Sequence, residues 1–142
     1  HLQKASYVSL QSALSFYGLI PEVVNITTSV STGRPERLDT PLGTFEFRHI
    51  KTELLFGYRM TELGEQSALI ATPEKALLDL IYLQPGGDSP AYLKELRLQN
   101  TEKLDKDLLR SQSEKFNTPK LQNAVKGILQ LISGESEKFE DL

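Results

Sequence analysis

The sequence predicts an α+β fold, in which an antiparallel sheet of about five strands combines with a leading helix, a central helix and a helical C-terminal portion. The chain has 142 residues, of which 39% are hydrophobic and 25% are charged, as in one soluble globular domain. The hydrophobic period is about 3.6 residues near the N-terminus, two residues over most of positions 23–71, and about 3.6 again afterwards. Together, these two observations indicate a sheet that is flanked in the sequence by helices.

The first helix is expected from Ser9 to Tyr17, because one apolar stripe recurs at helical spacing there. This stripe consists of Leu10, Ala13, Leu14 and Tyr17. Ser9 is a suitable N-cap, and Gly18 a suitable C-terminal stop. In the following segment, Val23 to Val30, alternating β-branched residues predict the first strand.

Two hairpins are expected next, each with a short turn rich in Gly or Pro. Their arms are Arg37–Thr40 with Thr44–Ile50, and Tyr58–Leu63 with Ser67–Ala71. Along the second arm of the first hairpin, side chains alternate between two faces. We therefore expect the rings of Phe45 and Phe47 to be buried and Arg48, on the other face, to be exposed.

The central helix is expected from Pro73, with Thr72 as its N-cap and Glu74 favourably placed at the positive end of the helix dipole. Its buried stripe is predicted to consist of Ala76, Leu77, Leu80 and Ile81. Lys75 and Asp79 are four residues apart, and we expect this pair on the opposite, outward face.

The remaining chain is predicted to be helical, over residues 92–98, over 104–116 and from Pro119 onwards. The expected organisation is an α+β core over residues 1–85, a helical extension of the same domain over 86–134, and an acidic tail over 135–142. Because the sequence begins with His1 and not with Met, we expect it to be a piece of a longer protein.

Catalytic and cofactor motifs are absent from the sequence. It contains no cysteine and only two histidines, His1 and His49, and it has no nucleophile elbow, phosphate-binding loop or metal-ligand spacing. We therefore expect no enzyme activity, no cofactor and no metal. The sequence has no secretory signal and no apolar run long enough for a membrane span, so a cytoplasmic protein without membrane contact is expected.

One enzymatic alternative comes from the first hairpin, where Asp39, Glu46 and Arg48 resemble the core of a Mg²⁺-dependent nuclease. The pattern departs from such cores because an arginine replaces the usual lysine, and arginine does not lose its proton to activate water. Alternating polar residues on a solvated strand account for the same positions without chemistry.

Cationic side chains gather around the same hairpin, although the formal net charge of the chain is −3. They are Arg34, Arg37, Arg48, His49 and Lys51. This cluster is either an ordinary solvated strand face or a contact surface for an acidic partner or a phosphate backbone. We take these five residues as the candidate contact site.

Four sequence blocks, in order, resemble AbiEi-type proteins, which are transcriptional regulators and antitoxins of bacterial type IV toxin-antitoxin systems. The blocks span residues 7–21, 40–50, 55–58 and 71–80. The resemblance covers roughly residues 5–85, and the sequence departs from the full family pattern by lacking its N-terminal winged helix.

This resemblance implies a regulatory or antitoxin domain that works by binding. In the family, the winged helix binds promoter DNA, and the cognate toxin of the abortive-infection system resembles a nucleotidyltransferase. The expected partners are therefore such a toxin, and promoter DNA through the absent winged helix. An alternative is a domain that mainly dimerises a plain repressor, which makes a homo-oligomer a further expectation.

Overall fold

The computed structural model describes residues 5–22 and 25–140, with side chains described as far as Gly134. It contains one six-stranded sheet with the strand order β3-β4-β2-β1-β6-β5, so the fold class is α+β as predicted. The strands are β1 (Ser6–Val8), β2 (Ile26–Ser31), β3 (Glu36–Thr40), β4 (Gly43–His49), β5 (Tyr58–Leu63) and β6 (Gln66–Ala71).

The sheet is mixed, which corrects the prediction of an antiparallel sheet of five strands. The two hairpins, β3–β4 and β5–β6, are antiparallel as expected. However, β2 pairs parallel with β4, and β1 pairs parallel with β6. Strand β1 has only three residues, which is too short to show a period of two in the sequence, and it joins the two halves of the sheet.

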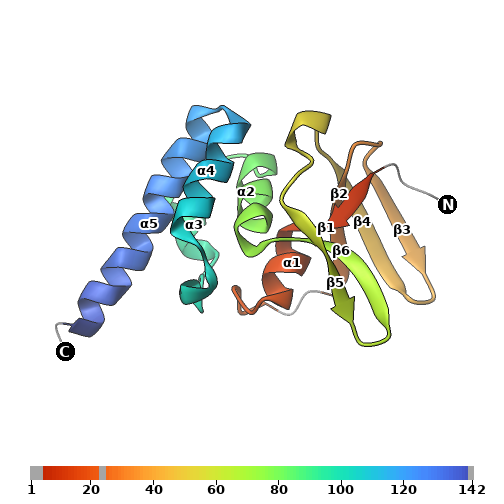
Figure 1. Ribbon diagram of the computed structural model, residues 1–142, viewed down its shortest axis with the longest axis horizontal. Helices are drawn as coiled ribbons and strands as arrows, with labels where there is room; N and C mark the ends of the chain where they lie inside the picture. The colour runs from red at the N-terminus through yellow and green to blue at the C-terminus, as the bar shows by residue number, and fades with distance from the viewer. Residues whose placement is uncertain (1–4, 23–24, 141–142) are drawn as a thin grey trace.

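Five α-helices and two short 3₁₀ helices complete the described part of the chain. They are α1 (Leu10–Phe16), η1 (Thr52–Leu54), α2 (Pro73–Leu83), α3 (Pro90–Glu95), η2 (Thr101–Lys103), α4 (Lys106–Phe116) and α5 (Pro119–Glu140). Figure 1 shows α1 and α2 beside the sheet, with α3, α4 and α5 beyond α2. Helix α2 therefore lies between the sheet and the C-terminal helices.

Parallel strands β1 and β6 explain the positions of α1 and α2. Each strand leads almost directly into one of these helices, so the two helices begin at the same end of the sheet and pack against each other. Among the described residues, one hydrophobic core runs from Tyr7 on β1, through α1 and α2, to Ile128 on α5. Helix α2 is buried on all sides within this core.

Local sequence signals were accurate for most elements. The side-chain oxygen of Thr72 caps α2 by accepting a hydrogen bond from the Lys75 amide at 3.3 Å, and Gly18 follows α1 with a φ of 73°. Strand β2 begins at Ile26, and the predicted strand residues 23 and 24 lie outside the described part. The segment expected as an acidic tail continues α5 as far as Glu140, and residues 141 and 142 lie outside the description.

Candidate functional site

The β3–β4 hairpin holds most of the predicted contact site. Arg37 on β3 lies directly opposite Glu46 on β4, and Arg48 is two residues further along the same strand. Arg37 and Arg48 therefore share one face of the sheet, with the Glu46 carboxylate between them. Arg34 and Lys51 are exposed in the segments before β3 and after β4.

Arg48 is half-buried, which corrects the expectation that it is fully exposed. Its Nη2 atom donates a hydrogen bond of 3.4 Å to the Leu83 carbonyl at the end of α2. Its parallel neighbour on β2 is the fully buried Val30. Because α1 and α2 cover this face of the sheet, Arg48 is partly enclosed between β4 and α2.

Phe45 and Phe47 are half-buried, where the sequence predicted full burial. They alternate with Arg48 along β4, so they lie on the face opposite to the one that α2 contacts. His49 shares their face, and its Nδ1 lies 3.0 Å from the Gly33 carbonyl oxygen. The five predicted contact residues therefore do not form one continuous surface.

Exposed cations remain within β3 and beside the end of the hairpin that lies away from its turn. The Arg37 side chain is 59% exposed, and the Asp39 side chain is 77% exposed. Arg37 Nε lies 3.9 Å from Asp39 Oδ1. Such a solvated pair adds little to stability. Arg34, Arg37 and Lys51 are therefore available for contact with an acidic surface.

The alternative nuclease residues Asp39, Glu46 and Arg48 share a face by strand register. Asp39 accepts a hydrogen bond of 2.9 Å from the Thr44 hydroxyl, and Arg48 is bonded to the end of α2. Within the described residues, no group of three or more carboxylate or imidazole side chains is placed to hold a metal ion.

A second charged group, Lys75 and Asp79, is sealed inside the protein. Lys75 Nζ lies 2.6 Å from Asp79 Oδ1, and both side chains are 0% exposed. The expectation that this pair lies on the outward face of the helix is therefore wrong. The physical reason is that apolar residues surround α2 on every side, so the helix has no solvent face.

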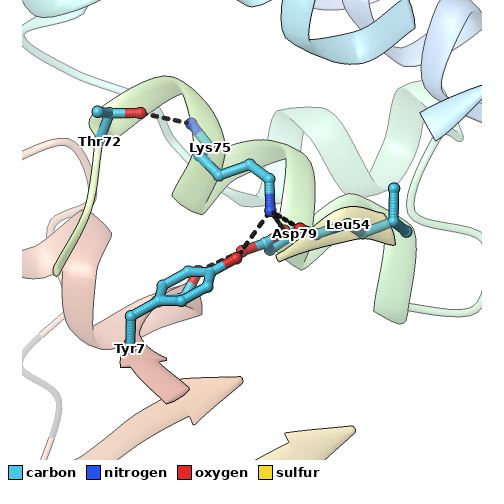
Figure 2. A network of polar contacts seen from close by, with 6 residues as sticks. Tyr7, Leu54, Thr72, Lys75 and Asp79 are labelled. Carbon is cyan, nitrogen blue, oxygen red and sulfur yellow. Dashed lines mark hydrogen bonds and ion pairs between the residues drawn. The ribbon is translucent and has the colours of Figure 1, made fainter. Parts of the chain in front are cut away.

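Hydrogen bonds saturate both charges of this pair (Figure 2). Lys75 Nζ also donates to the Tyr7 hydroxyl oxygen and to the Leu54 carbonyl, at 2.7 Å each. Asp79 Oδ2 accepts hydrogen bonds of 2.8 Å from the hydroxyls of Tyr7 and Ser9. An ammonium group has three protons to donate, and here each has an acceptor. We call Tyr7, Ser9, Lys75 and Asp79 the buried network.

Aromatic rings surround the lysine head group. Lys75 Nζ lies 4.4 Å from the ring centroid of Phe56, 5.2 Å from that of Phe116 and 5.3 Å from that of Tyr7. These distances suit cation–π attraction, which is stronger in a site without water. The lysine stem packs tightly as well, because a Cβ atom at Gly57 would lie 2.9 Å from Lys75 Cγ.

Burial dominates the electrostatics of the network. It lowers the pKa of Lys75 and raises the pKa of Asp79, while the attraction between the two charges opposes both shifts. The pKa of Tyr7 is raised by burial and by the adjacent Asp79 charge. The hydrogen-bond pattern, in which Asp79 only accepts and Lys75 only donates, fits an ammonium–carboxylate pair.

The buried network has the residue types of an acid–base site, but no surface at which to receive a substrate. Ser9, Lys75 and Asp79 are each 0% exposed, and Tyr7 is 2% exposed. What the arrangement does is hold four elements together: β1 and the start of α1 through Tyr7 and Ser9, η1 through the Leu54 carbonyl, and α2 itself.

Sequence reasoning identified the spacing of Lys75 and Asp79 but assigned them to the wrong environment. The available signal was the apolar run around them, since a helix that is hydrophobic all round is buried and its charges must then be paired. The partners Tyr7, Ser9 and Leu54 come from distant positions, and no local pattern in the sequence connects them.

No protein-family model matches the sequence, and no curated protein matches it. Within the described residues, no helix combines the length and the apolar character needed to cross a bilayer.

Proposed function

We propose that this chain is the regulatory, antitoxin domain of an AbiEi-like transcriptional regulator and that it acts by binding, not by catalysis. The observation that carries the proposal is the contrast between the two charged groups. The buried network satisfies its own donors and acceptors out of reach of solvent, whereas Arg34, Arg37 and Lys51 are exposed around the β3–β4 hairpin. The sequence blocks that resemble the family support the same proposal.

The partner surface is expected to be acidic, because three of the four exposed Lys, Arg, Asp and Glu side chains over residues 34–51 are cationic, and Asp39 is the exception. Exposed charges contribute little to folding. They do influence partner choice and association rate, since their field extends about 8 Å at physiological salt. The proposed partner is a nucleotidyltransferase-like toxin, and promoter DNA would be bound through a winged helix outside this chain.

The test is a growth-rescue assay in which the chain is co-expressed with a nucleotidyltransferase-like toxin encoded beside it. We expect Arg34→Glu with Arg37→Glu to abolish rescue at an unchanged melting temperature, because both side chains are exposed. Lys106→Glu with Arg110→Glu on α4 is the matched control, since it makes the same charge change far from the hairpin and should preserve rescue. Full rescue by the hairpin variant would contradict the proposed contact surface.

Duplex DNA is the competing partner for the same cations. With a net charge of −3 and no winged helix among the described elements, we expect only weak, salt-sensitive DNA binding. Fluorescence anisotropy with an operator fragment measures this directly. Nanomolar affinity at physiological salt would assign operator recognition to these residues and contradict the proposed division of roles.

A further inference from the structure

The two edge strands of the sheet differ in how well they are protected against pairing with another strand. Strand β3 is flanked by Pro35 and Pro41 and has the charged residues Arg37 and Asp39 within it. Prolines and charges are the usual means by which natural proteins block an edge. The β3 edge is therefore poorly suited to strand addition.

Strand β5 carries the charges Arg59 and Glu62 but lacks the flanking prolines of β3. It contains no proline, and its side chains include Tyr58 (37% exposed), Met60 (64%) and Leu63 (40%). These are three of the five exposed large hydrophobic residues among those described. Among the described residues it pairs with β6 alone, so its other side is open to a further strand there.

The main-chain groups that face this open side can be assigned from the hairpin geometry. Leu63 and Gln66 are opposite each other across a two-residue turn, and such a closing pair exchanges its hydrogen bonds within the hairpin. At the other end, the Gly57 carbonyl accepts a hydrogen bond of 2.8 Å from the Thr72 amide, so Gly57 also faces β6. The main-chain groups of successive residues point to alternate sides of a strand. The N–H and C=O groups of residues 58, 60 and 62 therefore point away from β6.

We propose that β5 pairs antiparallel with β5 of a second copy of this chain, about a twofold axis that passes beside Met60. This inference does not depend on the proposed antitoxin function. In this register Met60 lies opposite Met60 of the second copy, Tyr58 opposite Glu62, and Arg59 opposite Thr61. Residues 58, 60 and 62 then meet as hydrogen-bonded pairs, which satisfies the outward main-chain groups of both strands.

Neighbouring twofold registers are disfavoured by their side-chain pairs. Centring the axis on Arg59 places two arginines directly opposite each other, and centring it on Glu62 does the same for two glutamates. Like charges in this position are destabilising. An axis at Thr61 would place Met60 opposite Glu62 and Arg59 opposite Leu63, which exposes each apolar side chain to a charge. The axis at Met60 avoids like-charge pairs, sets the two Met60 side chains opposite each other, and leaves Tyr58, whose hydroxyl is polar, as the partner of Glu62.

The Tyr58 end of the open edge is anchored to the core, which lowers the entropy cost of pairing at that end. The Tyr58 ring stacks on Tyr7 with a centroid distance of 4.6 Å and an interplanar angle of 16°. Tyr7 in turn is bonded to Lys75 and Asp79 of the buried network. Because strand pairing alone buries less than the ~1,200 Å² of a standard interface, we expect a reversible dimer that depends on concentration.

Sedimentation equilibrium of the whole chain over a range of concentrations tests the proposal. We expect the mass to rise from 15.9 kDa toward twice that value, with Met60→Lys and Met60→Glu each remaining monomeric. An equimolar mixture of these two variants should restore the dimer, because opposite charges then meet at position 60. Leu42→Lys, at a fully solvated turn position (92% exposed), is the control and should dimerise normally.

A cysteine cross-link tests the register separately. The chain has no native cysteine, so Met60→Cys introduces a single thiol. Directly opposed residues in a hydrogen-bonded pair have Cα atoms about 5.5 Å apart, which suits a disulfide. Met60→Cys should therefore form a covalent dimer on mild oxidation, and Glu62→Cys should not. A monomer at every concentration, or equal cross-linking of both variants, would overturn the proposal.

Discussion

Lys75 Nζ and Asp79 Oδ1 lie 2.6 Å apart, one helical turn from each other on α2, and neither side chain has any exposed surface. Removing two charges from water costs several kcal/mol for each ion, and their attraction repays this only when other hydrogen bonds complete the site. Tyr7, Ser9 and the Leu54 carbonyl supply those bonds. The pair therefore connects α2 to β1, α1 and η1 in a single arrangement.

Breaking the pair is expected to be strongly destabilising. Lys75→Met and Asp79→Leu, made singly, should each lower the free energy of unfolding by ~3–5 kcal/mol, because each leaves an uncompensated buried charge. Urea denaturation measures both losses. Losses below about 1 kcal/mol would mean that water reaches the site.

Replacing the whole buried network is expected to lower the free energy of unfolding by less than replacing Lys75 or Asp79 alone. In the variant Tyr7→Phe/Ser9→Ala/Lys75→Met/Asp79→Leu, the Leu54 carbonyl loses its bond from Lys75 but still accepts one from the Phe56 amide at 3.1 Å. Replacing a buried ion pair by apolar residues of similar volume is often neutral or stabilising. This apolar variant should therefore be more stable than either single variant in the same denaturation experiment.

Helix α2 also supplies an apolar test of packing. Leu80 is 2% exposed, so Leu80→Ala should lower the free energy of unfolding by ~2–5 kcal/mol through the cavity it leaves. Leu42→Ala in the β3–β4 turn is the control and should change it by less than about 0.5 kcal/mol. A loss under half a kcal/mol for Leu80→Ala would show that α2 is not packed as described.

Gly57 and Gly64 form a matched pair for separating backbone strain from crowding. Their φ angles are +76° and +66°, but a Cβ atom would lie 2.9 Å from Lys75 Cγ at Gly57 and would contact nothing within 4 Å at Gly64. Gly64→Ala should cost ~1–2 kcal/mol from the left-handed conformation alone. Gly57→Ala should cost a further ~1–3 kcal/mol from overpacking. Equal losses in thermal denaturation would contradict the close contact with Lys75.

Alkaline pH should destabilise the protein through Tyr7. Burial and the Asp79 charge raise the pKa of Tyr7 above its ordinary value of 10.0, whereas the tyrosine of the unfolded chain ionises near that value. Above about pH 10 the folded state therefore binds more protons than the unfolded state, and the free energy of unfolding falls as the pH rises. Denaturation at a series of pH values should show a smaller slope for Tyr7→Phe, and an equal slope would refute this assignment.

The sequence predicted those features that depend on neighbouring residues. The Thr72 cap, the stop at Gly18 and the two hairpins all follow from patterns within a few positions, and the α+β class follows from their order. The parallel pairing of β2 with β4 was not predictable in this way. It depends on which strand of the β3–β4 hairpin lies next to β2, and the sequence near the hairpin does not indicate this. Likewise, the burial of Lys75 depends on Tyr7 and on the packing of α4, which are distant in the sequence.

The candidate contact site was predicted only in part for the same reason. Alternation along β4 correctly separated Arg48 from Phe45 and Phe47. It could not indicate which of the two faces the helices cover, and the hydrogen bond from Arg48 to Leu83 follows from that choice. Whether the exposed cations bind a partner stays a prediction.

The central claim is that the buried network serves the fold and that function depends on the exposed surface. The most direct test is growth rescue from the co-expressed toxin by the apolar variant Tyr7→Phe/Ser9→Ala/Lys75→Met/Asp79→Leu, at a temperature where circular dichroism shows it to be folded. The account predicts rescue equal to that of the unmodified chain. A folded apolar variant that fails to rescue growth would contradict it, because the chemistry of the network would then be needed for the function.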